Sequence, residues 1–136
     1  MKLITLSGKE IYRSGFKYKV NWDKKERSQF QTNVKNFLKP YLFSHWVFCE
    51  FPCYGTRLKI DIFDATTKIA YEINGDHHRE YNPFFMNKSR SKYLRCLRND
   101  GLKIKWCEIN KIKLIEIYKE DVLSREFFIE RFQIYL

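Results

Sequence analysis

The sequence predicts an α/β domain with a mixed central sheet of about four strands and helices packed against it. The apolar patterns read helix, three strands, helix, strand, helix, and such an order is typical of a sheet covered by helices. The size agrees, since 136 residues, 44% of them hydrophobic, suit one domain with a sizeable core. We expect an N-terminal arm or small hairpin over 1–27, a core over 28–118 and a C-terminal helical segment over 119–136.

The elements are predicted in chain order from their apolar spacing. A first helix is expected over 28–42, where aromatic and aliphatic residues recur every three or four positions. The remaining elements are a strand over 46–51, a hairpin with strands at 57–63 and 68–74, a long helix over about 87–108, a strand over 113–118 and a final helix over 122–135.

Two of the predicted helices carry apolar side chains that need a partner. In the long helix, Leu94, Leu97 and Ile104 are expected to form the stripe that faces the core. The final helix presents four aromatic rings: Phe127, Phe128, Phe132 and Tyr135. The sequence leaves open whether these rings seal a homodimer or close the core of the monomer.

The hairpin over 57–74 is the most informative segment. With a turn centred on 65–66, antiparallel pairing joins positions whose numbers sum to 131. In that register Asp61 faces Ala70, and Lys59 faces Glu72. Diagonal neighbours on one face lie about 7–8 Å apart, so one ion is within joint reach of Asp61 and Glu72.

Alternation of side chains along the strands divides this hairpin into two faces. The polar face holds both acids together with Lys59, Ala70 and Asn74. The other face is apolar and consists of Leu58, Ile60, Ile62, Ile69, Tyr71 and Ile73. Two acids beside a core, in a chain of net charge +10, predict a divalent cation held against a polyanion.

The charge and the apolar runs narrow the function classes. Lys and Arg total 26 against 16 acids, a balance that favours nucleic acid or an anionic membrane as partner. The chain has no run of about 18 apolar residues, so no membrane-spanning helix is expected. The first apolar stretch is too short for a signal peptide, and we expect a cytoplasmic protein.

The cysteines are expected to be reduced thiols in that compartment. Cys49 and Cys53 have a C-x3-C spacing, which is a weak indication of zinc, and Cys96 and Cys107 lie eleven apart in a helical pattern. Four ordinary, partly buried thiols are the preferred interpretation.

The order of elements and several residues resemble the PD-(D/E)xK nuclease superfamily, closest to the branch of very-short-patch-repair-like endonucleases and phage and mobile-element nucleases. Asp61 in the middle of a hairpin strand and Glu72 near the end of an apolar strand carry the resemblance, with a basic helix soon after. The tail after the hairpin, Gly75, Asp76 and His78, adds to it. The resemblance covers about 28–118 and implies a restriction-endonuclease-like core, an origin in a phage or mobile element and, for a phage protein, the host cytoplasm.

Two positions depart from the superfamily pattern. Asn74 stands where a lysine is usual, and Ile60 replaces the proline expected before the first acid. Some superfamily members are inactive, so the resemblance implies the fold more directly than it implies activity.

The resemblance implies a Mg²⁺ site, with Mn²⁺ as a substitute, because hard oxygen ligands hold such ions and the ions support phosphodiester hydrolysis. Asp61, Glu72 and the carbonyl of Ile73 would be the ligands. Asn74 would orient a water or a phosphate, and Lys59 would replace the missing lysine from across the hairpin. An ordinary cross-strand ion pair is the alternative for Lys59.

Three further residues are candidates on weaker grounds. Gln31 lies one turn into the first helix, where superfamily members often place an acid or Gln, with an ordinary exposed helix residue as the alternative. Glu50 is either brought near the site by the neighbouring strand or is a surface acid. His78 is favoured over His77 as a site residue. An HNH-type site is disfavoured, because no histidine follows His78 to serve as a further ligand.

The stretch over 88–113 is predicted to bind phosphates, since it holds nine basic residues and two acids. Lys88, Arg90, Lys92 and Arg95 are the expected contacts. The sequence thus predicts a Mg²⁺-dependent endonuclease acting on DNA, with RNA left open. The rivals are an inactive nucleic-acid-binding module, a ribonuclease or structure-selective nuclease, and a protein-interaction domain with a basic face.

Overall fold

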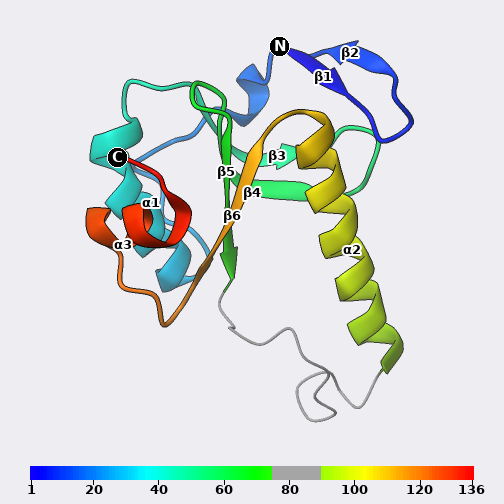
Figure 1. Ribbon diagram of the computed structural model, residues 1–136. Coiled ribbons are helices and arrows are strands. Elements are labelled where there is room, and N and C mark those ends of the chain that lie inside the picture. Colours follow the sequence, from blue (N-terminus) through cyan, green and yellow to red (C-terminus); the bar gives the residue numbers. More distant parts are fainter. Residues whose placement is uncertain (75–89) are drawn as a thin grey trace.

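A computed structural model describes residues 1–74 and 90–136, with side chains in the second range described from 94 onward. These residues form a mixed α/β structure with three α-helices and a four-stranded mixed sheet (Figure 1). The predicted class and the predicted order of elements are therefore confirmed. The predicted residues Gly75, Asp76, His77, His78 and Lys88 lie outside the described residues.

The sheet has the strand order β3-β4-β5-β6, formed by β3 (Val47–Pro52), β4 (Lys59–Asp64), β5 (Ile69–Asn74) and β6 (Lys113–Tyr118). The first three strands pair antiparallel, and β6 joins β5 in parallel. The parallel connection passes through the long helix α2 (Arg90–Ile109), as a crossover requires.

The N-terminal segment forms a small antiparallel hairpin of β1 (Lys2–Ile4) and β2 (Glu10–Tyr12), followed by a 3-10 turn η1 (Phe16–Tyr18). This is the hairpin alternative of the sequence prediction. The side chain of Asn110 fastens it to the end of α2, because its Oδ1 accepts the Ile4 amide and its Nδ2 donates to the Ile4 carbonyl.

Helix α1 (Gln29–Leu42) begins where the sequence predicts, because Ser28 caps it: the Ser28 hydroxyl accepts the Gln31 amide at 3.0 Å. Helix α3 (Arg125–Phe132) is shorter than predicted. Ser124 caps its start and Gln133 ends it in a left-handed conformation, so both ends are fixed by local geometry.

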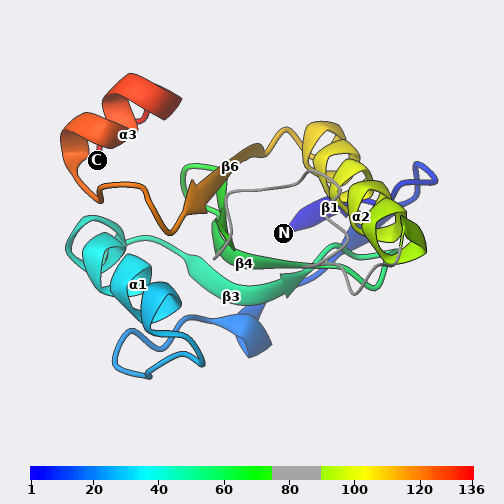
Figure 2. The same ribbon diagram turned by 90° about the horizontal axis from the view of Figure 1, so that it is seen from below.

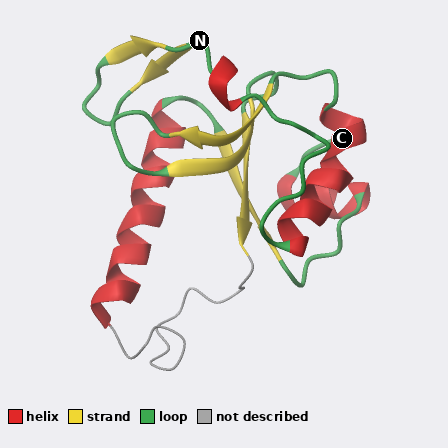
Figure 3. Cartoon of the chain, turned by 180° about the vertical axis from the view of Figure 1, so that it is seen from behind, coloured by secondary structure: helices red, strands yellow, loops and turns green. Residues whose placement is uncertain are grey.

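Helices cover the sheet on both sides (Figures 2 and 3). One core packs β4, β5 and β6 against α1 and α3, and a second core joins the sheet to α2 and the N-terminal hairpin. Phe128 is fully buried in the first core, with Phe127 and Phe132 packed at its edge. The aromatic rings of α3 thus close the monomer's core, whereas Tyr135, beyond the helix, is exposed.

The predicted apolar stripe of α2 is wrong. Leu94, Leu97 and Ile104 are exposed by 41% to 50%, whereas Trp106 and Cys107 are buried. The face of the helix that meets the sheet is therefore a different one from the predicted stripe, and the buried residues come from its C-terminal half. The spacing of the apolar residues could not show this, because the start of α2 points away from the sheet and its C-terminal end lies beside it (Figure 1).

The β4–β5 register differs from the prediction by two positions. Ile62 pairs with Tyr71 and Phe63 with Ala70, so paired numbers sum to 133. The turn is longer because the Asp64 carboxylate accepts the amides of Thr66 and Thr67 and the Thr67 hydroxyl. A shift of two keeps side chains on their predicted faces, and Ile62, Tyr71 and Ile73 do share one core.

The other predicted face is not a polar one. Phe63 and Ala70 lie on it and are buried in the second core, under α2. Ile60, predicted to share a face with Ile62, is in this second core instead. The reason is a local distortion of β3 and β4 between these positions, and this distortion forms the candidate site.

Candidate active site

The site lies at a local distortion of two neighbouring strands, β3 and β4. On β3, Glu50 has a left-handed backbone, with φ of 50°. Regular pairing of the two strands resumes on either side of Glu50 and Asp61, at Cys49–Ile62 and Phe51–Ile60. The strands therefore bend at the Glu50–Asp61 position, and the two faces of the sheet exchange there.

At this bend the backbone ladder between β4 and β5 gives way to side-chain bonds. The amide of Ile73 donates to Asp61 Oδ2 at 2.9 Å, and the amide of Asp61 donates to Glu72 Oε1 at 3.2 Å. Each carboxylate thus binds the backbone of the strand opposite. The sequence-predicted pair, Asp61 and Glu72, is therefore brought together by these two bonds.

Helix α2 supplies a lysine to this pair. Lys103 Nζ lies 2.9 Å from Glu72 Oε2, and both side chains are largely buried. The sequence reading counted Lys103 only as part of the basic run. The spacing does indicate an inward-facing Lys103. It lies three and four positions before the buried Trp106 and Cys107, so it is on the same face of the helix as these two residues.

Burial has a larger effect than Lys103 on the pKa values of both acids. Burial, with the Asp61 carboxylate adding to it, raises the pKa of Glu72 to about 7, against the opposing effect of Lys103. Burial also raises the pKa of Asp61, an effect that the Ile73 amide and Lys103 oppose and that Glu50 and Glu26 increase. Although burial works to lower it, the pKa of Lys103 is raised by Glu72.

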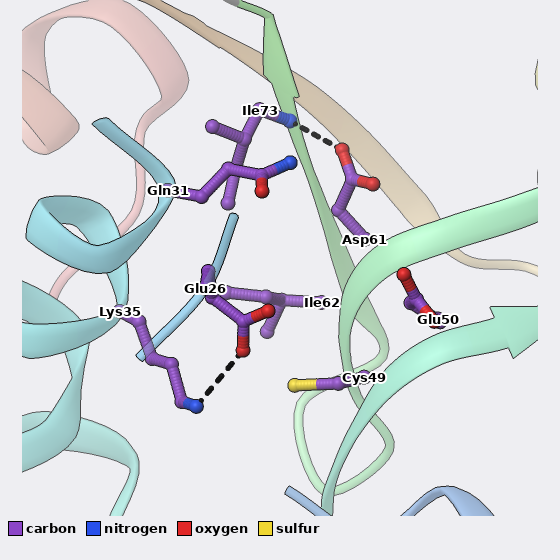
Figure 4. A pocket seen from close by; sticks show the side chains of 8 residues that line it. All are labelled: Glu26, Gln31, Lys35, Cys49, Glu50, Asp61, Ile62 and Ile73. Atoms are coloured by element: carbon purple, nitrogen blue, oxygen red, sulfur yellow. Dashed lines mark hydrogen bonds and ion pairs between the residues drawn. The ribbon is translucent and has the colours of Figure 1, made fainter. Parts of the chain in front are cut away.

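A cavity of about 30 Å³ opens beside Asp61, toward the start of α1 (Figure 4). Its walls come from α1, the loop before it and the three strands β3, β4 and β5: Glu26, Gln31, Lys35, Cys49, Glu50, Asp61, Ile62 and Ile73. The prediction that Gln31 and Glu50 approach Asp61 is matched by their positions in this wall. The volume exceeds the 10–15 Å³ or so that one water needs.

Lys35 is a second basic residue that the sequence reading missed. Its side chain is 2% exposed, and Nζ binds Glu26 Oε1 at 3.0 Å and the carbonyl of Lys24 at 2.8 Å. The position could be recognised from its spacing, because Lys35 lies three residues before the buried Leu38 and beside the buried Val34.

Lys59 does not replace the missing lysine, contrary to the prediction. It pairs with Pro52 at the far end of β4, and its side chain is exposed. The two-residue shift in register and the bend at Asp61 move it away from Glu72. Asn74 ends β5 and pairs with Tyr118 of β6, so it remains two residues from Glu72 on the same strand.

The predicted phosphate contacts on α2 are described only in part. Arg95 is exposed, whereas Arg90 and Lys92 belong to the helix but their side chains lie outside the described residues. The structure therefore leaves these contacts as predictions.

The four cysteines are free thiols, and burial raises the pKa of Cys49 to about 11 and those of Cys53 and Cys107 to about 12. Within the described residues, no group of three or more His, Cys, Asp or Glu side chains is arranged to hold a metal ion. A cation at this site would therefore depend on two carboxylates and on neutral oxygens.

Comparison with protein-family models, with curated protein sequences and with solved structures finds no match to this chain. Among the described residues, no helix is both long enough and apolar enough to cross a membrane. The functional conclusion therefore depends on the geometry of the site.

Proposed function

We propose that this protein is a Mg²⁺-dependent endonuclease that hydrolyses DNA phosphodiester bonds on a restriction-endonuclease-like core of the PD-(D/E)xK type. The observation that carries the proposal is that Asp61 and Glu72 lie together at the strand bend, where each carboxylate accepts an amide of the opposite strand and Lys103 binds Glu72. Two acids and a lysine are the residue types that hydrolysis of a phosphodiester requires, and Asp61 also lines the cavity toward α1.

The donor set fits a hard divalent cation. Asp61 and Glu72 provide carboxylate oxygens, and burial together with the nearby Asp61 carboxylate raises the pKa of Glu72 to about 7, an effect that a bound cation would oppose. Asp61, Glu72 and the carbonyl of Ile73 would hold the ion, with the Gln31 amide at the cavity wall. When bound, Mg²⁺ or Mn²⁺ would neutralise phosphoryl oxygens and lower the pKa of a bound water.

The protein's own residues would orient and balance this site. The Ile73 amide fixes one oxygen of Asp61, and the Asp61 amide fixes one oxygen of Glu72, so both carboxylates are held before substrate binds. Lys103 holds the other oxygen of Glu72 and provides positive charge where Asn74 provides none. Lys103, rather than Lys59, is therefore our candidate for the role of the missing lysine.

Cleavage of supercoiled plasmid tests the proposal. The wild type should nick the plasmid with Mg²⁺ or Mn²⁺ and not in EDTA. The nicking rate should fall in Asp61→Asn and in Glu72→Gln. The fall should exceed the roughly 10- to 100-fold loss of activity that is typical when a residue supporting a metal ligand is replaced. Glu108→Gln, which changes an exposed acid on α2, should retain activity. Equal nicking by all four proteins would identify a contaminant and overturn the proposal.

A second candidate is a non-catalytic nucleic-acid-binding module with the same fold. The observation that favours it is the Lys103–Glu72 pair itself, because a lysine bound to Glu72 neutralises an acid without any metal. Mn²⁺ binding followed by electron paramagnetic resonance separates the two. An ion that is lost in Asp61→Asn supports the nuclease, and DNA binding without Mn²⁺ binding supports the module.

A further inference from the structure

A groove of about 580 Å³ runs beside the small cavity at Asp61, along the segment that joins η1 to α1. The two hollows share Glu26, Gln31, Lys35, Cys49 and Glu50 in their walls, so the groove leads directly to the candidate site. The residues that line the groove come from η1, that segment, α1, β3 and β4. Figure 2 shows the segment before α1 on the α1 side of the sheet, away from the basic helix α2 that the sequence predicted as the phosphate-binding surface.

The groove is strongly basic. Seven lysine and arginine side chains line it against two acids, and the Lys35–Glu26 ion pair neutralises one of each. Six basic residues remain against Glu50, and all six are exposed: Lys17, Lys19, Lys24, Lys25, Arg27 and Lys59. Within the described part of the chain, none of these six forms an ion pair, which leaves them available for an anionic ligand.

The segment that carries half of these charges is held in place from below. The buried Lys35 ammonium binds the carbonyl of Lys24 and the carboxylate of Glu26, and the amide of Glu26 donates to the Thr32 hydroxyl at 3.0 Å. These bonds fix the backbone around Lys25, so its side chain and those of its neighbours extend from a rigid wall. A preorganised cluster of this kind reduces the entropy lost on binding.

We propose that this groove binds the sugar–phosphate backbone of a nucleic-acid strand and directs it to Asp61. A row of separate, exposed cations in a concave wall matches the repeated charges of a polynucleotide. A lipid surface would instead be met by a convex or flat face. The inference deepens the proposed function, because it places the substrate on the α1 side of the bend.

Fluorescence anisotropy with labelled oligonucleotides in EDTA tests the groove without any chemistry. Lys24→Gln/Lys25→Gln should weaken binding about tenfold or more and reduce the slope of log affinity against log salt by about 1.4 on a single strand and about 1.8 on a duplex. Lys59→Gln, on the opposite wall, should reduce the slope by about half as much. Single-stranded and duplex probes of one sequence identify which form the groove prefers.

Lys9→Gln/Lys119→Gln is the matched control, since it removes two exposed charges that lie outside the groove and outside the stretch of α2 predicted to bind phosphates. If this variant loses as much affinity as the lysine pair, or if the lysine pair binds like the wild type, the inference is overturned. Binding to phosphatidylserine vesicles but to neither oligonucleotide would also overturn it. Groove-dependent binding without cleavage supports the inference and counts only against the nuclease proposal.

Discussion

Lys103 and Glu72 lie 31 positions apart in the sequence, yet the Lys103 ammonium is 2.9 Å from a Glu72 carboxylate oxygen inside the structure. The pair joins α2 to β5 at the place where the sheet bends. It is therefore both a link between the helix and the sheet and the charge partner of the candidate site.

Replacement of Lys103 by Met should destabilise the protein, because it leaves Glu72 buried beside Asp61 without its cation. We expect a loss of about 1–3 kcal/mol in the free energy of unfolding at pH 8, measured by urea denaturation. The loss should shrink at pH 5, where Glu72 is protonated. Lys103→Met/Glu72→Gln should recover part of the loss, and strict additivity of the two single changes would contradict the pairing.

Stability should also depend on pH through Glu72. Its pKa is raised from 4.5 to about 7 in the folded state, so between these values the folded protein binds more protons than the unfolded chain. The free energy of unfolding should therefore fall as the pH rises through this window, by up to about 3 kcal/mol in total. Urea denaturation of wild type and Glu72→Gln at pH 5, 6, 7 and 8 isolates this contribution, which the variant should lack.

A divalent cation should reverse this destabilisation. An ion that binds only the folded state stabilises it by about 2.7 kcal/mol at 100 times its dissociation constant. With Mg²⁺ at pH 8 we expect the thermal unfolding midpoint of the wild type to rise and that of Asp61→Asn to stay unchanged. Removal of the ion with EDTA should return the unfolding midpoint of the wild type to its value without Mg²⁺. An equal rise in both proteins would show that the ion binds elsewhere.

Asp64 should be among the most sensitive positions in the β4–β5 turn. It is fully buried and accepts bonds from Thr66, Thr67 and the His45 imidazole, the last at 2.8 Å. Asp64→Ala leaves these donors unsatisfied and should cost about 2–4 kcal/mol of unfolding free energy. Asp64→Asn keeps an acceptor and should cost less, whereas Asp23→Ala, at an exposed acid, should cost little.

Because Asp64 fixes the turn, its loss should also reach the site. A change of turn that slips the pairing by one residue would move Asp61 to the opposite face from Glu72. Hydrogen exchange of the Ile73 amide measures this, since that amide is bound by Asp61 only in the native register. In Asp64→Ala we expect the Ile73 amide to exchange faster than global unfolding of that variant can explain.

The order of elements and the closeness of Asp61 to Glu72 could be predicted from the sequence, because both follow from the periodicity of apolar residues. The register could not be predicted, since a two-residue shift leaves that periodicity intact and depends on the bonds that Asp64 makes. Lys103 was missed for a related reason. Its role depends on the rotation of α2 about its axis, and the exposed Leu94 and Leu97 indicated the wrong rotation.

The bend at Glu50 and Asp61 has a consequence for how this protein can change over generations. The two hydrophobic cores lie on opposite faces of the sheet, and the acids lie at the bend, where the strands pass side chains from one core to the other. A conservative substitution deep in either core, such as Phe128→Leu or Trp106→Phe, should change how the strands pack at this bend. Selection can therefore adjust the spacing of Asp61 and Glu72 from a distance while the site's own residues stay unchanged.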